Sequence, residues 1–166
     1  MTPPFADLKA SDIMQDRVVT VESSDTLRDA LKLMTEHHVS GLPVIKPGNR
    51  CVGVISASDI LNVEQEHSPE PGEETHDYAR YFNPETGEWE EILASAFALE
   101  EHGNLPVGDI MTTNIIAVAP ETTLPGVAAT MVKRDVHRVL VLDDGQTLLG
   151  LISSVDFVRL VAEGAA

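Results

Sequence analysis

Two short motifs in the chain pair a hydroxyl with a carboxylate at the spacing of one helical turn. Ser56 is followed by Asp59, and Ser153 is followed by Asp156. Each serine stands where an apolar strand pattern gives way to a helical one. A serine hydroxyl and the free N–H groups of a helix start suit a phosphate, and an ionised carboxylate one turn on can accept hydrogen bonds from both hydroxyls of a ribose. Binding of a nucleotide-like ligand is therefore one interpretation.

The same spacing also has a purely structural interpretation. In a capping box the serine side chain accepts a hydrogen bond from the backbone three residues on, and the acid reaches back to the N–H of the serine. Both motifs have this form. Helix capping in an empty site therefore stays open beside ligand binding.

Both motifs belong to a unit that occurs twice in the chain. Asp12-Ile13-Met14 returns as Asp109-Ile110-Met111, and the offset of 97 residues then holds without a gap. Two copies can bury their apolar faces against each other about a pseudo-two-fold axis, and such a pair leaves clefts between its halves where small ligands bind. The further identical pairs are Val21/Val118, Thr26/Thr123, Leu27/Leu124, Met34/Met131, Val39/Val136, Val44/Val141, Gly48/Gly145, Gly53/Gly150, Ile55/Ile152, Ser56/Ser153 and Asp59/Asp156.

Each copy predicts the same elements in the order strand, helix, strand, strand, helix. The fold class is α/β, with tandem β-α-β-β-α repeats packed about the pseudo-two-fold axis. The apolar patterns predict these elements at 18–21, 26–37, 42–45, 51–55 and from 56, and again at 115–118, 124–133, 139–142, 148–152 and from 153.

The predicted domains are a first repeat at 8–63, an insert at 64–104 and a second repeat at 105–163. The insert is strongly acidic and ends in a predicted helix near 88–101, because Trp89, Ile92, Leu93, Ala96 and Phe97 recur at helical spacing. It also carries His67, His76 and His102, whose spacing matches no common metal site. A solvated acidic loop is the default, and a loose divalent-cation site is the alternative.

Composition excludes several classes of protein. The net charge of −16 argues against nucleic acid or an anionic membrane as the partner. No apolar run approaches the ~20 residues of a membrane helix, and the N-terminus does not have the pattern of a secretory signal. The single cysteine, Cys51, lies in a strand pattern and is expected to be a buried thiol. These features favour the cytoplasm.

The chain also has no pattern typical of an enzyme. It contains no Gly-x-x-x-x-Gly-Lys loop, its serines are not in a nucleophile-elbow context, and Cys51 has no evident base. We therefore expect neither catalytic residues nor a resident metal or cofactor.

The repeated order of Asp-Ile-Met, strand, apolar helix and Gly-x-x-Ser-x-x-Asp resembles the CBS domain, named after cystathionine β-synthase. The first copy matches most closely, with Val39-Ser40-Gly41-Leu42-Pro43-Val44 and Gly53-Val54-Ile55-Ser56-Ala57-Ser58-Asp59-Ile60. The resemblance implies a Bateman module, a non-catalytic pair that commonly binds AMP, ADP, ATP or S-adenosylmethionine between its repeats and commonly forms a homodimer.

Carried over residue by residue, the resemblance implies a set of ligand-binding positions. Val18, Val19, Ile115 and Ile116 would form the walls around a purine. Thr20 and the backbone of Gly41-Leu42-Pro43 would bind its polar edge, with phosphate at the serines and ribose at the acids. The candidate residues are Val19, Thr20, Gly41, Leu42, Pro43, Ser56, Asp59, Ile116, His137, Arg138, Ser153 and Asp156.

The second copy departs from this pattern. His137-Arg138-Val139-Leu140 replaces Ser40-Gly41-Leu42-Pro43, and Ala117 replaces Thr20. His137 and Arg138 would then either contact a phosphate or form a solvated strand edge.

The leading hypothesis is a regulatory module that binds an adenine nucleotide and signals to an unidentified protein partner through the insert. One alternative is a ligand-free scaffold for interaction or dimerisation. Another is a module that responds to divalent metal through its acidic insert.

Overall fold

The computed structural model describes residues 5–67, 78–83, 88–93 and 102–164. The contacts within the chain divide it into two compact units, each built from separate segments. Unit 1 comprises Met1–Val18, Pro47–Cys51 and Ile115–Ala166, and unit 2 comprises Val19–Lys46 and Val52–Asn114.

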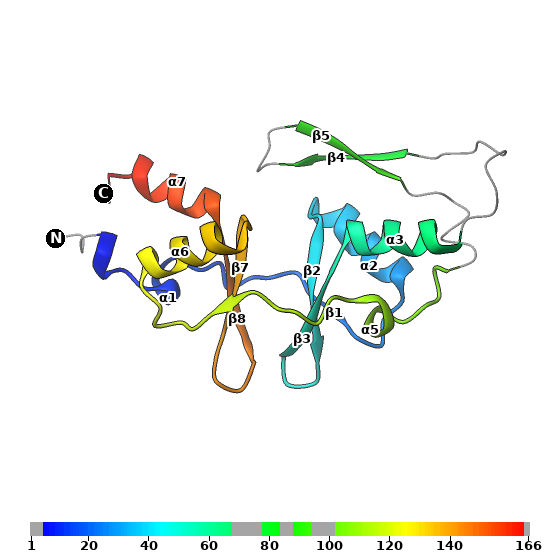
Figure 1. The fold of residues 1–166 in the computed structure, drawn as a ribbon, viewed down its shortest axis with the longest axis horizontal. Coiled ribbons are helices and arrows are strands. Elements are labelled where there is room, and N and C mark those ends of the chain that lie inside the picture. Colours follow the sequence, from blue (N-terminus) through cyan, green and yellow to red (C-terminus); the bar gives the residue numbers. More distant parts are fainter. Residues whose placement is uncertain (1–4, 68–77, 84–87, 94–101, 165–166) are drawn as a thin grey trace. The chain divides into compact units, whose positions relative to one another are not determined.

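Unit 2 holds the first three-stranded sheet, in the order β1-β2-β3 (Figure 1). Strand β1 runs parallel to β2. Apolar side chains of the sheet and of helix α2 form one core, in which Met34, Leu42 and Ile55 are fully buried. The elements are β1 (Val21–Glu22), α2 (Leu27–His37), β2 (Gly41–Lys46), β3 (Arg50–Ser56), α3 (Ala57–His67) and α5 (Val107–Ile110).

Unit 1 holds the second sheet, in the order β6-β7-β8, with β6 parallel and β8 antiparallel to β7. Its core combines Val127 and Met131 of a helix with Val139, Val141 and Ile152 of the sheet. The elements are η1 (Phe5–Asp7), α1 (Ala10–Ile13), β6 (Ala117–Val118), α6 (Leu124–Arg134), β7 (Arg138–Leu142), β8 (Leu148–Ser153) and α7 (Ser154–Ala162).

The predicted α/β class, with two β-α-β-β-α repeats, is confirmed. The first strand of each repeat is shorter than predicted. In place of 18–21 and 115–118, only Val21–Glu22 and Ala117–Val118 are strands. The reason is that each pairs with its neighbour at just two positions, such as Val21 with Val44.

The two repeats exchange the short helix with which each begins. Helix α1 belongs to the first repeat in sequence but contacts β8, while α5 belongs to the second repeat and contacts β1 and α3. Equivalent hydrogen bonds hold both: Ala10 N–H donates to Thr122 O at 2.8 Å, and Val107 N–H donates to Asp25 O at 2.8 Å. The boundaries at 8–63, 64–104 and 105–163 stay predictions, and they follow the sequence repeats rather than these units.

The methionine of each Asp-Ile-Met motif lies against a glycine of the other repeat. A Cβ atom built on Gly150 would lie 2.8 Å from both Met14 Sδ and Gln15 O, and one on Gly53 would lie 2.6 Å from Met111 Sδ and 2.8 Å from Thr112 O. A side chain does not fit at such distances. The two glycines therefore allow a neighbouring chain segment to approach the strand closely.

The insert contains a hairpin where a helix was predicted. Strands β4 (Tyr78–Asn83) and β5 (Glu88–Leu93) are antiparallel, and Phe82 pairs with Trp89. The helix predicted near 88–101 is therefore wrong for 88–93, while 94–101 lie outside the described residues. A short apolar stripe does not distinguish helix from strand, and here pairing with the aromatic-rich strand decides.

The turn between β7 and β8 depends on the carboxylate of Asp143. Its Oδ1 accepts the N–H of Thr147 at 2.7 Å and the N–H of Gly145 at 2.9 Å. These bonds, that of Thr147 foremost, lower the pKa of Asp143 below its ordinary value of 3.8. The ionised form is thus favoured in the folded state, so it stabilises the fold above about pH 3.8, and this stabilisation is lost as the pH falls through the lowered pKa.

Gly150→Ala should lower the free energy of unfolding by about 1–3 kcal/mol, because the new methyl group meets backbone and a packed sulfur atom. Urea denaturation measures the loss. Gly126→Ala is the control. It lies in α6, its nearest contact is the movable Thr122 methyl at 3.1 Å, and alanine favours helix by up to about 1 kcal/mol. Equal destabilisation by both changes would contradict the packing argument.

Asp143→Asn should destabilise the fold at pH 7, and the difference from the unchanged chain should shrink as the pH falls below 3.8. Urea denaturation at pH 7 and at pH 3 measures both differences. The exposed neighbour Asp144, whose carboxylate is not an acceptor of this turn, supplies the control Asp144→Asn. A destabilisation by Asp143→Asn that is the same at both pH values would show that the ionised form has no special role.

Candidate functional site

Both serine–aspartate motifs form capping boxes at the start of a helix. At α3, the N–H and the Oγ of Ser56 donate to Asp59 Oδ2 at 2.7 and 2.6 Å. At α7, the N–H and the Oγ of Ser153 donate to Asp156 Oδ2 at 2.8 and 2.9 Å. The structural interpretation is thus confirmed for both motifs. It engages one oxygen of each carboxylate, and the state of the other oxygen decides what else the acid can bind.

A second donor reaches each acid from the exchanged segment. Thr112 Oγ1 donates to Asp59 Oδ1 at 3.2 Å. Gln15 Nε2 donates to Asp156 Oδ1 at 3.0 Å and to Oδ2 at 3.2 Å. Gln15 and Thr112 are 97 positions apart and directly follow the two Asp-Ile-Met motifs. We did not predict them from the sequence, although their equivalent place after a repeated motif was a usable signal.

Paired backbone hydrogen bonds fix both donors in place. Gln15 N–H donates to Leu151 O at 2.9 Å, and Leu151 N–H donates back to Gln15 O at 3.0 Å. Thr112 and Val54 exchange the same two bonds, each at 2.9 Å. Since Leu151 and Val54 stand two residues before the capping serines, the exchanged segment is held beside the acid in each unit.

The two acids differ in their surroundings. Asp156 is 4% exposed, and Arg159 Nη1 lies 3.2 Å from its Oδ1. Asp59 is only partly buried. Arg159 itself remains largely exposed, so its ion pair is screened by solvent. The bonds to Gln15 are partly buried, and those to Ser153 are buried.

In unit 2 the structure brings Gly41 close to the serine. A Cβ atom built on Gly41 would lie 3.7 Å from Ser56 Cβ, and Ala57 N–H donates to Ser40 O at 2.9 Å. Leu42 is fully buried in the core and Pro43 is buried. Leu42 can therefore contribute only its backbone, as predicted for the polar edge of a purine. Val19 and Thr20 are half-buried in the same unit.

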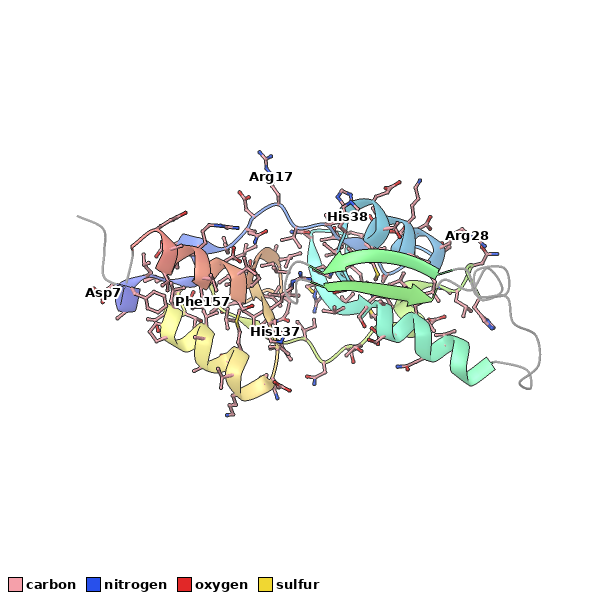
Figure 2. The ribbon with its side chains drawn as sticks, turned by 90° about the horizontal axis from the view of Figure 1, so that it is seen from above. Asp7, Arg17, Arg28, His38, His137 and Phe157 are labelled. Atoms are coloured by element: carbon pink, nitrogen blue, oxygen red, sulfur yellow. The ribbon has the colours of Figure 1, made fainter. Side chains whose placement is uncertain are left out.

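In unit 1 the segment His137–Arg138 lies beside Ser153 and Ser154. Arg138 of β7 pairs with Ser153 of β8, and His137 O accepts the N–H of Ser154 at 2.9 Å. The side chain of His137, labelled in Figure 2, is exposed. Ile116 is half-buried against the core of this unit. Contact of His137 or Arg138 with a phosphate stays a prediction.

In the part of the chain that the structure describes, no three His, Cys, Asp or Glu residues gather as a metal site requires. Cys51 is buried, as predicted. None of the described helices has the length and apolar character needed to cross a membrane. His76 lies outside the described residues.

Comparison with known proteins agrees with the repeat structure. The family model for the CBS domain matches residues 10–66 and again residues 107–163. The uncharacterized protein MJ1426 of Methanocaldococcus jannaschii is 28% identical over 156 residues, which cover 89% of this chain and 88% of that protein. For further relatives the covered share of their own length is much smaller, between 21% and 57%.

Solved structures with the same fold include complexes with adenosine compounds. A crystal structure of CBSX2 in complex with AMP has a TM-score of 0.67 at 24% identity and covers 95% of this chain and 98% of its own. The CBS domain pair of protein MJ0100, in complex with 5′-methylthioadenosine and S-adenosyl-L-methionine, has a TM-score of 0.62 at 20% identity and covers 95% of this chain and 98% of its own. At these identities the likeness shows the fold.

CBS domain pairs are generally regulatory modules, and where a longer enzyme carries one, the pair is its regulatory part. The two family matches cover more than half of this chain. Each contains a sheet, a capping serine and an aspartate one helical turn after that serine. The chain therefore belongs to the CBS domain family and contains a tandem pair.

Proposed function

We propose that the chain is a non-catalytic regulatory module that binds an adenosine compound of the AMP, ADP, ATP or S-adenosylmethionine type at one or more of its serine–aspartate motifs. The observation that carries the proposal is the oriented carboxylate of Asp59. Its Oδ2 is held by Ser56, while its Oδ1 accepts only the exposed Thr112 hydroxyl among the described residues. A ribose diol can replace or join that hydroxyl.

The surrounding groups suit the other parts of such a ligand. The start of α3 carries the partial positive charge of a helix N-terminus, which favours a phosphate. The backbone at Gly41 lies beside Ser56 without a side chain of its own, and half-buried Val19 offers apolar surface for a base. The ligands of CBSX2 and MJ0100 support the adenosine class, since both structures share this fold.

In this proposal the ligand regulates by favouring one of two arrangements of the protein. It can do so only to the extent that it binds one arrangement more tightly. The protein partner that receives the signal, the homodimer and the cytoplasmic location stay predictions.

A ligand-free interaction scaffold is the second candidate. Val155, Val158 and Val161 favour it, because these side chains of α7 are 37%, 67% and 60% exposed. An apolar helix face of this kind often marks a contact with another protein. Titration with adenosine compounds separates the two candidates, because a scaffold would bind none of them.

Isothermal titration with AMP, ADP, ATP, S-adenosylmethionine and 5′-methylthioadenosine should show binding of at least one compound. Asp59→Asn should weaken it about 10- to 100-fold, because hydrogen bonds to a charged group contribute about 1.5–3 kcal/mol. The control Asp109→Asn makes the same charge change at an exposed position in the same unit and should leave the affinity unchanged. Absence of heat with all five compounds at high protein concentration would refute the proposal.

A further inference from the structure

We propose that this module takes one adenosine-type ligand per chain, at the Asp59 motif, and that the Asp156 motif is closed by Gln15, Arg138 and Arg159. The inference rests on the proposed function and adds the number and location of its sites. It follows from differences in the surroundings of two motifs that share the Ser-x-x-Asp pattern.

Both oxygens of Asp156 are already engaged within the protein. Oδ2 accepts the N–H and hydroxyl of Ser153 and lies 3.2 Å from Gln15 Nε2. Oδ1 accepts from Gln15 Nε2 at 3.0 Å and from Arg159 Nη1 at 3.2 Å. Because Asp156 is 4% exposed, a ribose hydroxyl would have to displace the Gln15 amide from the carboxylate, and a hydrogen bond to a charged group would be lost.

The outer oxygen of Asp59, Oδ1, has a different environment. Among the described residues Oδ1 accepts one hydrogen bond, from the Thr112 hydroxyl at 3.2 Å, and this contact is exposed. A hydroxyl rotates freely and can serve as donor or acceptor, so Thr112 can turn toward a ligand or toward water at little cost. The equivalent Gln15 contacts both oxygens of its acid through one amide nitrogen, which cannot accept a hydrogen bond from a ligand hydroxyl.

The neighbouring strand makes the same distinction at the serines. Opposite Ser153, strand β7 carries Arg138, whereas the equivalent position beside Ser56 is Gly41, which adds no side chain. Correspondingly, Ser153 is 6% exposed, and Ser56 is only partly buried. The second copy thus has less room for a phosphate as well as fewer free acceptors for a ribose.

The three closing residues have different counterparts in the first copy. Thr112 stands in place of Gln15, Gly41 in place of Arg138, and Asn62 in place of Arg159. These three substitutions between the copies act on one serine–acid pair, from the exchanged segment, the adjacent strand and the helix itself. We therefore infer that Gln15, Arg138 and Arg159 are specificity-determining residues for the number of sites.

Calorimetric titration of the full chain with AMP, or with S-adenosylmethionine if AMP gives no heat, should give one site per chain. Asp59→Asn should weaken binding at least about tenfold. Asp156→Asn should change the affinity by less than about twofold and leave the stoichiometry at one site per chain, while lowering the melting temperature, because Asp156 serves the fold. Circular dichroism monitors folding of each variant. Two sites per chain, or loss of binding through Asp156→Asn in a folded protein with Asp59→Asn silent, would overturn the inference.

The triple variant Gln15→Thr, Arg138→Gly and Arg159→Ala gives the second motif the open surroundings of the first, and its stoichiometry should rise toward two. A folded triple variant that still binds one ligand would show that these residues do not close the site. If the triple or the Asp156 variant does not fold, the stoichiometry of the unchanged chain and the Asp59→Asn titration still decide. Absence of any binding by the unchanged chain would refute the proposed function together with this inference, whereas two sites would refute this inference alone.

Discussion

The rest of the structure depends on the docking of each Asp-Ile-Met segment against a strand of the other repeat. Two reciprocal pairs of backbone hydrogen bonds, Gln15 with Leu151 and Thr112 with Val54, hold the segments. The packing requires Gly150 and Gly53, since Met14 and Met111 occupy the space that a Cβ atom would need. This constraint explains why methionine and glycine recur together in both copies although they lie far apart in the sequence.

The same docking joins the fold to the candidate site. The residue that follows each docked methionine donates a hydrogen bond to a carboxylate that caps a helix of the other repeat. Gln15 donates to Asp156 at the start of α7, and Thr112 donates to Asp59 at the start of α3. Each acid therefore depends for its orientation on two segments, its own helix start and the exchanged one. The proposed ligand site therefore depends on both segments.

Capping and ligand binding are compatible uses of one carboxylate, because it has two oxygens. In both copies the inner oxygen, Oδ2, stabilises the helix start. The outer oxygen of Asp156 has Gln15 and Arg159 as donors, while that of Asp59 has the exposed Thr112 hydroxyl. The two Ser-x-x-Asp motifs therefore differ in their surroundings although they share the serine and the aspartate.

The sequence by itself determined the repeat, the α/β class and the two serine–acid motifs, because these depend on local periodicity and on an offset that is constant along the chain. It did not predict that residues 88–93 form the second strand of a hairpin, since Trp89 and Ile92 suit a strand as well as a helix. Only the tertiary structure decided which repeat each short helix joins and which side chain faces each acid. Gln15 and Asp156 are 141 positions apart, and a pairing at that separation arises from the packing of whole elements, which no local pattern of residues records.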